Sequence, residues 1–436
     1  MALRQYRIPV FYGIAQNVTE NRQNDGESPD ACNMDTSSGR LSVAKGYVRE
    51  RTSPSRAGID PAFYVWRENV KAFRRRSELF VLDESANEWK SLIDFGTEAS
   101  AVQYDFLPVK IASTEYLLIA NGTARMIKWD GASASAELFG STEGLSDIAV
   151  NFVELYYARL FAAGDAAHPS RLYYSQAPGD TRTIESWTVA EESENVSGGF
   201  VEVGTDSDPI TGLFALSNQP LIFKRDSLYR LLGDRLAISR IQPVNGTMQQ
   251  PVHTACVRAG DVLYFLTEGG MYYFDGQSVQ KKRDADKVQS LLKNANLFAC
   301  MACARGDNLY FSFHEGSDAG ANDAILIYDL VRGTYMVRRG FTARGLYSAG
   351  GTLHLMDGAG RVCRFEEGET YDGARIDAYW KTPMTDLDSK AVNKRLEELY
   401  LRGSGGILRS RRRPKAAPST TSGSCRAAAN GFWSLV

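Results

Sequence analysis

The residues best suited to metal binding in this chain are two cysteines, Cys300 and Cys303, separated by two positions. A structural zinc site needs four ligands, and neither a second Cys-x-x-Cys pair nor a closely spaced histidine pair accompanies them. The pair lies in a strand-like run, where residues three apart point to opposite faces. We therefore predict that both cysteines are structural and individually dispensable, and that the protein holds no metal and no other cofactor.

The histidines suggest no catalytic constellation either. Four occur, at positions without metal-ligand spacing, and we interpret them as turn or core residues: His168, His253, His314 and His354. Gly-x-Ser-x-Gly, Walker and dinucleotide-binding patterns are absent from the sequence. The sequence therefore predicts no catalytic and no cofactor-binding residues, and we expect that the protein is not an enzyme.

Two further patterns have a chemical reading and a structural one. The Asp-Gly pairs at Asp130, Asp275 and Asp357 are isolated, whereas a calcium loop needs several oxygen ligands within a dozen residues, so we interpret them as turns. A propeller glycosidase needs a carboxylate pair, usually with an arginine cluster. The arginines at 74–76 are contiguous, so their side chains alternate between faces and make a poor clamp for a carboxylate.

The elements that would position any site recur along the chain. Seven strand-like runs each carry a leucine among aromatic and branched residues, and each is followed by a turn and a second such run: Leu79, Leu117, Leu160, Leu221, Leu263, Leu309 and Leu353. Successive differences are 38, 43, 61, 42, 46 and 44 residues. Five of the six lie near the ~40–45 residues that a four-stranded propeller blade uses. Because an isolated hairpin cannot bury its apolar face, the repeat predicts radially arranged sheets.

We therefore predict an all-β chain whose main domain is a β-propeller of six or seven blades. The expected organisation is an N-terminal extension with a closing strand (1–60), the propeller (61–370), the start of a C-terminal β segment (371–407) and a disordered basic tail (408–436). Small-residue strands such as 254–257 suit the crowded centre of the ring. The segment near 41–48 and the segment 374–381 are the two candidates to complete a terminal blade.

Three segments depart from the repeat. The 61-residue interval contains an insertion over 174–203, which we expect on a face or rim. A helix is predicted over 285–294, with Asp284 as its N-cap. No acidic residue follows Glu398, and from Leu408 the chain is rich in Arg, Pro, Ser and Ala, a composition typical of disorder. This tail is either a natural arm or the product of a frameshift, and limited proteolysis after its arginines tests for disorder.

Composition limits the classes of partner. Apolar residues make up 43% of the chain, which is ample for a core. The formal net charge is −2, from 50 basic and 52 acidic residues, which argues against specific nucleic-acid binding as the main purpose. No apolar run reaches the ~18–20 residues that span a membrane. Residues 1–7 contain no apolar signal region, so we expect no export and a reducing compartment.

One segment resembles a known class of proteins. Glu27-Ser28-Pro29-Asp30-Ala31-Cys32-Asn33-Met34, followed by Gly39-Arg40-Leu41 and Gly46-Tyr47, resembles the opening of tailed-phage propeller proteins of the nozzle, hub and head–tail stabilising class. There a Ser-Pro-x-x-x-Asn segment precedes a Gly-x-Leu-x-x-x-x-Gly-Tyr strand. Later segments at 117–122, 170–175 and 220–224 are similar, so the resemblance covers roughly 25–400. It implies subunits assembled into homo-oligomeric rings.

The resemblance implies a virion structural protein, a tail or head–tail connector component, assembled in the bacterial cytoplasm. Its expected partners are portal, adaptor or tail proteins, with no membrane. The alternative is a glycan- or protein-binding propeller, such as an adhesin or receptor-binding protein, and a third reading is a propeller glycosidase. Exposed Trp and Tyr clustered on one face would favour glycan binding. Carboxylates and arginines converging at the central channel would favour an enzyme.

Overall fold

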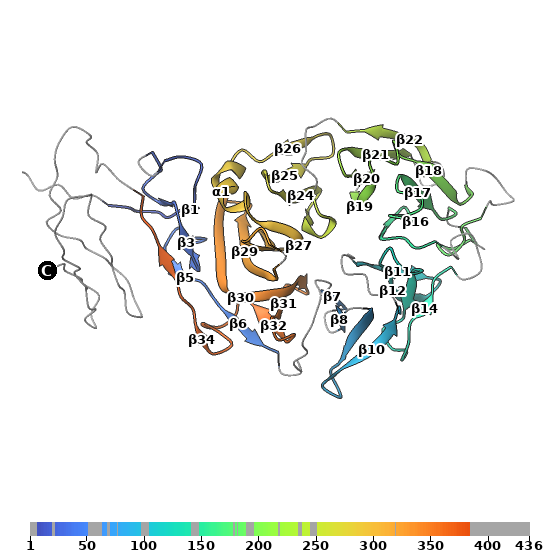
Figure 1. The fold of residues 1–436 in the computed structure, drawn as a ribbon, viewed down its shortest axis with the longest axis horizontal. Helices are drawn as coiled ribbons and strands as arrows, with labels where there is room; N and C mark the ends of the chain where they lie inside the picture. The colour runs from blue at the N-terminus through green and yellow to red at the C-terminus, as the bar shows by residue number, and fades with distance from the viewer. Residues whose placement is uncertain are drawn as a thin grey trace, which may run out of the picture. The chain divides into compact units, whose positions relative to one another are not determined.

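The computed structural model of the chain describes residues 7–383, apart from 20–21, 51–62, 68–69, 76, 97–103, 141–147, 178, 181, 189–195, 217–218, 234–237, 245–250 and 319. The described part is almost entirely β-structure (Figure 1). The part of the expected C-terminal β segment beyond residue 383 and the basic tail from 408 lie outside the described residues.

Most strands form five four-stranded antiparallel sheets in which neighbours in the sequence are neighbours in the sheet. Each sheet comprises four successive strands: β7 (Phe63–Trp66), β8 (Val70–Arg75), β9 (Glu78–Asp83) and β10 (Glu88–Asp94); β11 (Asp105–Ile111), β12 (Thr114–Ala120), β13 (Ile127–Trp129) and β14 (Glu137–Leu138); β15 (Phe152–Tyr156), β16 (Arg159–Ala163), β17 (Arg171–Tyr174) and β18 (Gly199–Glu202); β19 (Ile210–Leu216), β20 (Gln219–Lys224), β21 (Leu228–Gly233) and β22 (Ile238–Pro243); β23 (Cys256–Ala259), β24 (Val262–Thr267), β25 (Gly270–Phe274) and β26 (Val279–Lys281). This up-and-down order is the one that short hairpins between antiparallel strands produce.

A sixth sheet has nine strands because one long strand serves two units. β30 (Thr334–Ala349) pairs with β29 (Asn322–Asp329) through its first half and with β31 (Thr352–Asp357) through its second half. The remaining members are β27 (Asn296–Arg305), β28 (Asn308–His314), β32 (Val362–Phe365), β6 (Tyr47–Arg49), β33 (Thr370–Tyr371) and β34 (Ala374–Arg375). The orders β27-β28-β29-β30 and β30-β31-β32-β6 are two further four-stranded units, which favours seven blades over six.

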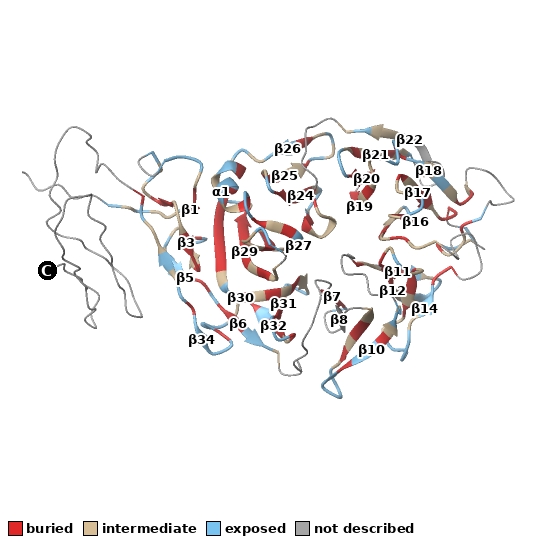
Figure 2. Cartoon of the chain, in the orientation of Figure 1, coloured by how far each residue is buried: buried red, intermediate tan, exposed pale blue. Residues whose placement is uncertain are grey.

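The sheets succeed one another around a common centre, which makes the fold a β-propeller. The first strands of consecutive units contact each other, as β11 does β15 and as β27 does β30. Hydrophobic clusters fill the space between each sheet and the next, and burial follows the strand faces (Figure 2). The last unit contacts the first, where Gly345 leaves no room for a Cβ against Phe63. The predicted all-β propeller is therefore confirmed.

The strand that closes the last unit comes from the N-terminal segment. β6 pairs antiparallel with β32, with Tyr47 opposite Phe365 and Arg49 opposite Cys363. The predicted strand at 374–381 is instead two short strands, β34 and β35 (Tyr379–Trp380), and β35 pairs with β3 (Ala31–Cys32). Of the two candidates for completing a blade, the N-terminal one takes that role.

All seven anchor leucines are fully buried, but they do not occupy equivalent positions. Six lie in the second strand of a unit, whereas Leu79 lies in β9, the third strand of the first sheet. The second strand there is β8, whose sequence carries Lys71, Arg74 and Arg75 and offers no leucine. The anchor was therefore placed one strand too late, and this shortens the first interval to 38 residues.

The insertion and the helix lie where the sequence places them. The insertion connects β17 to β18, the third and fourth strands of one sheet. Residues 285–292 form a turn of 3-10 helix, Ala285–Val288, followed by α1 (Gln289–Leu292). Asp284 stands at the N-cap as predicted, but its side chain makes no capping hydrogen bond. It accepts a hydrogen bond from Tyr328 Oη at 2.8 Å instead.

Residues 7–50 form an extended arm along the outer edge of β30. Its short strands are β1 (Gly13–Ile14), β2 (Glu27–Ser28), β3, β4 (Met34–Asp35), β5 (Ser42–Val43) and β6. The backbone N–H of Asn33 donates to Val337 O at 3.0 Å, so the arm uses hydrogen-bonding groups that an edge strand would otherwise expose. We call residues 7–50 the N-terminal arm.

Candidate functional site

Two carboxylates, a histidine and an arginine converge on the inner strands of the propeller. Asp105 and Glu154 belong to β11 and β15, while His253 and Arg258 lie just before and within β23. His253 Nε2 lies 3.5 Å from Asp105 Oδ1, and an Arg258 terminal nitrogen lies 3.7 Å from Glu154 Oε2. These contacts join the fifth sheet to the second and third.

Each carboxylate also joins one sheet to the next through the backbone. Asp105 Oδ2 accepts a hydrogen bond from the N–H of Val153 at 2.8 Å, and Glu154 Oε2 accepts one from the N–H of Ala215 at 2.8 Å. The acceptor lies on the first strand of one sheet, and the donor lies on the first strand of the following sheet. The same device thus links three consecutive sheets at their inner strands.

Burial dominates the electrostatics of Glu154. Desolvation raises the pKa of its carboxyl to about 7, against the lowering effect of the Ala215 N–H and of Arg258. Its Oε1 accepts a hydrogen bond from the N–H of Leu155 at 3.1 Å. Each oxygen therefore accepts one backbone hydrogen bond, and together these bonds fix the orientation of the carboxyl.

His253 is held by aromatic stacking. Its ring lies 4.6 Å from that of Phe214 and 5.0 Å from that of Phe152, measured between centroids. At Gly212 a Cβ would lie 2.9 Å from His253 Nδ1, so this position must remain glycine for the ring to fit. Nδ1 is buried and has no hydrogen-bond partner in the described part of the chain. The ring is therefore held between the inner strands mainly by its contacts with Phe152 and Phe214.

The cysteine pair lies as the strand alternation predicts. Cys300 and Cys303 are both in β27, and they belong to different hydrophobic clusters on the two faces of that strand. Burial raises the pKa of both thiols well above the ordinary value. Among the described residues no group of three or more His, Cys, Asp or Glu is placed to hold a metal ion.

The structure keeps the remaining histidines apart. His314 lies with Nδ1 3.0 Å from Asp323 and Nε2 3.1 Å from Asp318, and the hydrogen bond to Asp318 raises its pKa. His354 contacts Glu50 of the N-terminal arm at 2.9 Å. The backbone of His168 forms a turn with Asp165 and Arg171. The turn interpretation thus fits His168, whereas His314 and His354 make polar contacts with carboxylates.

The Asp-Gly pairs are turns, as predicted. Asp130 Oδ1 accepts hydrogen bonds from the N–H groups of Ala132 and Ser133, at 2.9 and 2.7 Å. Asp275 and Asp357 cap their turns in the same way. Arg74 and Arg75 of the arginine run lie in β8, but the structure does not describe their side chains. Arg76 lies outside the described residues.

The residues that carry the phage resemblance lie together at a second site, in the N-terminal arm. Asn33 is 2% exposed, and its amide makes four side-chain hydrogen bonds. It donates to Arg339 O at 2.9 Å and Asp377 O at 2.8 Å, and it accepts from Arg339 N at 2.8 Å and Tyr371 Oη at 3.0 Å. One side chain therefore fastens the arm to β30 and to the segment that follows the propeller.

The other signature residues have equally specific roles. Ser28 Oγ donates to Lys381 O at 2.6 Å, which joins the arm to the end of the described chain. At Gly46 a Cβ would overlap the carbonyl of Thr370. Tyr47 stacks on Tyr371 at 5.4 Å and starts the closing strand β6. Together Ser28, Asn33, Gly46 and Tyr47 fasten the arm to the last blade and to residues 370–381, and we call this set of contacts the clasp.

Sequence reasoning missed the inner-strand cluster. Its members are 153 positions apart at the extremes, Asp105 and Arg258, and no local motif connects them. A signal was available, since Asp105 and Glu154 are lone carboxylates at the first strands of two repeats otherwise rich in apolar residues. A charge on the innermost strand needs a partner, and that partner comes from another blade.

Comparison with known proteins adds little. No family model and no curated protein matches the sequence. Among solved structures, Raptor of Chaetomium thermophilum has a TM-score of 0.47 and 10% identity over 74% of this chain and 29% of its own length. BamB of Moraxella catarrhalis has a TM-score of 0.42 and 11% identity over 74% of this chain and 97% of its own. This chain therefore spans well under half the length of Raptor.

Proposed function

We propose that this protein is a structural component of a tailed-phage virion, in the tail or the head–tail connector, where it acts as an assembly platform. The observation that supports the proposal is the clasp. Ser28, Asn33, Gly46 and Tyr47 are four residues of the phage-like signature, and each contacts the last blade or the segment 370–381 that follows it. These four signature residues therefore take part in one architectural feature, and this supports the proposal.

The inner-strand cluster is compatible with a scaffold role. Convergent carboxylates with an arginine are what an enzyme would need, and Asp105, Glu154 and Arg258 do converge. Their oxygens, however, accept hydrogen bonds from backbone N–H groups of the next sheet. We infer that these groups hold blades in register, and that the protein has no hydrolytic activity of its own.

No described feature favours the glycan-binding alternative. The exposed large aromatic residues lie on separate elements instead of forming one cluster: Tyr12, Tyr157, Phe200, Phe298 and Tyr379. In the part of the chain that the structure describes, no helix is long and apolar enough to cross a membrane. We propose that the partners are portal, adaptor or tail proteins, and that assembly occurs in the cytoplasm of the bacterial host.

Mass spectrometry of purified particles tests the virion assignment. The protein is expected in the particles at a fixed ratio to the other tail or connector proteins, and immunogold labelling should mark one end or the neck. Its absence from particles whose other structural proteins are all detected would refute the assignment. Hydrolysis of a panel of glycosides by the wild type, lost in Glu154→Gln, would refute the non-enzymatic reading.

A further inference from the structure

The N-terminal arm turns its acidic residues inward. Three of them pair with cations of the propeller, Glu27 with Lys287 at 2.9 Å, Asp30 with Arg339 at 4.0 Å and Asp35 with Arg338 at 3.6 Å, and a fourth, Glu50, contacts His354 at 2.9 Å. As whole residues, the described acidic residues of the arm are buried or half-buried, although the Asp30 side chain keeps 47% of its surface exposed. Most of the negative charge on the described part of the arm is therefore directed at side chains of the propeller.

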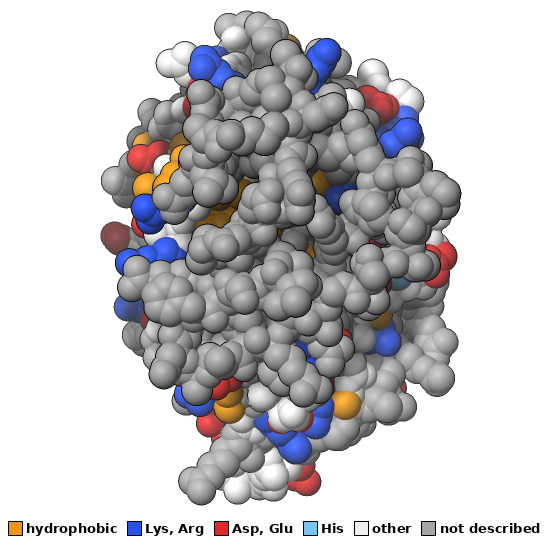
Figure 3. All heavy atoms as spheres, turned by 90° about the vertical axis from the view of Figure 1, so that its left-hand side faces the viewer, with side chains coloured by type: hydrophobic (Ala, Val, Ile, Leu, Met, Phe, Trp, Pro, Cys, Tyr) orange, Lys and Arg blue, Asp and Glu red, His pale blue; other side chains and the backbone are white. Residues whose placement is uncertain are grey.

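The basic residues of the arm face solvent. All five in the described range are exposed: Arg7, Arg22, Arg40, Lys45 and Arg49. Large apolar side chains are exposed beside them in the sequence, with Tyr12 at 43%, Val43 at 56% and Val48 at 38%. Figure 3 shows this side of the molecule, where Lys, Arg, Asp and Glu side chains all reach the surface. The outer side of the arm is thus basic and apolar.

The outer strands of the second and third sheets have the opposite character. We call the exposed residues there the acidic rim: Glu137 and Leu138 of β14, Asp180 of the insertion, and Phe200 and Glu202 of β18. Leu138 is 45% exposed and Phe200 52%. The insertion bridges the two sheets, because Glu185 contacts Lys128 of β13 at 2.9 Å.

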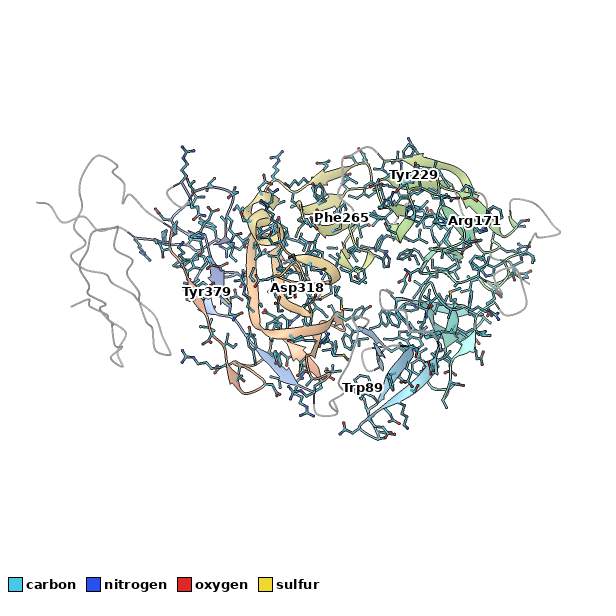
Figure 4. All side chains as sticks on the ribbon, in the orientation of Figure 1. Trp89, Arg171, Tyr229, Phe265, Asp318 and Tyr379 are labelled. Atoms are coloured by element: carbon cyan, nitrogen blue, oxygen red, sulfur yellow. The ribbon has the colours of Figure 1, made fainter. Side chains whose placement is uncertain are left out.

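Two cationic side chains near the acidic rim, Lys128 and Arg171, are mostly buried. The Lys128 side chain is 14% exposed and lies between Glu185 and Glu137. The Arg171 side chain is 18% exposed, pairs with Glu202 at 2.9 Å and lies 3.8 Å over the Phe200 ring. Figure 4 labels Arg171 on the third sheet and Tyr379 beside the arm, at opposite sides of the ribbon. The two surfaces therefore carry opposite charge, and each of them also exposes apolar side chains.

We propose that the arm of one copy docks on the acidic rim of a second copy, head to tail. The inference deepens the proposed function by naming the subunit interface of the ring. Within one chain the two surfaces cannot meet, because the arm lies on the last sheet and at least one whole sheet separates it from the rim on either side. Different complementary patches on one chain are the requirement for a heterologous interface, which closes into a ring or extends as a filament. Charge complementarity around apolar contacts fits a protein partner.

Sedimentation of the purified full chain at low and high salt tests this. The wild type is expected to form oligomers whose dissociation constant rises with salt, since rim charges are screened. Arg40→Glu with Lys45→Glu on the arm, or Glu137→Lys with Asp180→Lys on the rim, should each weaken association on the order of tenfold. A chain with all four substitutions restores opposite charge and should recover association. The matched control, Lys110→Glu with Lys293→Glu, reverses exposed cations elsewhere and should leave association unchanged.

Circular dichroism and melting temperature must match the wild type for each variant. A monomeric wild type at low salt, arm or rim variants that associate like the wild type, or a fourfold variant that does not recover would each overturn the proposal. Binding of a DNA duplex that the arm variant abolishes, without self-association, would assign the arm to nucleic acid instead and also overturn it. Particle composition tests the proposed function and sedimentation tests this interface, so either can fail without the other.

Discussion

Replacing Asn33 by alanine should release the N-terminal arm from the propeller. The substitution removes four side-chain hydrogen bonds, which join the arm to Arg339, Tyr371 and Asp377. At about 1 kcal/mol each, their loss costs about 4 kcal/mol. Asn33 also has a φ of 53°, a left-handed conformation that costs alanine about 1 kcal/mol more. The expected total is about 5 kcal/mol.

Asn87 provides a matched control. It has the same φ of 53° but lies exposed in the turn between β9 and β10. Asn87→Ala should therefore lower the free energy of unfolding only by the backbone term, about 1 kcal/mol. The difference between the two variants isolates the hydrogen bonds from the effect of φ.

Hydrogen exchange read by mass spectrometry, together with denaturant unfolding, measures the effect. In Asn33→Ala the amides of Arg339 and of residues 371–381 should exchange more than about 100-fold faster than in the wild type, which corresponds to a loss of about 3 kcal/mol or more. Asn87→Ala should leave these amides close to wild type. If the two variants differ by less than about 1 kcal/mol, the clasp does not hold the arm and the reasoning is wrong.

Three further predictions concern the core. The raised pKa of Glu154, about 7 against 4.5, gives stability that is full below about pH 4.5 and lost as pH rises through 7; the free energy of unfolding from denaturant titrations should fall by about 2.5 kcal/mol between pH 5 and pH 8, and Glu154→Gln should remove that slope. Gly345→Ala should lower the free energy of unfolding by about 1–3 kcal/mol, because its Cβ would press on Phe63 where the last unit meets the first, and a neutral result in thermal melts would contradict that contact. Cys300→Ala and Cys303→Ala should each fold and melt cooperatively, and elemental analysis of protein purified without added metal should find no stoichiometric zinc; one bound zinc per chain would contradict this.

The repeat is a local property of the sequence, and so it could be predicted. A leucine that must be buried between two sheets recurs once per unit, and all seven anchors are fully buried. The turns are equally local, because an aspartate such as Asp130 caps N–H groups only two and three residues ahead. Cys300 and Cys303 follow from strand alternation in the same way. The insertion and the helix at 285–292 also follow from local pattern.

Position within a blade was harder to predict. A leucine marks a buried strand but does not say whether that strand is second or third, and Leu79 was assigned to the wrong one for this reason. The strand that closes the last blade could not be chosen from the sequence for the same reason. The segments around 41–48 and 374–381 are both β-forming, and only pairing with β32 distinguishes β6 from the later segment.

The sequence alone therefore determined the fold class, the repeat, the turns and the placement of the two cysteines on opposite faces of a strand, since each depends on residues a few positions apart. The tertiary structure decided what crosses between blades: the cluster that joins Asp105 and Glu154 to His253 and Arg258, and the clasp of Asn33. The physical reason is that a propeller brings inner strands together around one centre regardless of their separation along the chain. Which carboxylate meets which backbone N–H is therefore set by the geometry of the closed ring, and no spacing in the sequence records it.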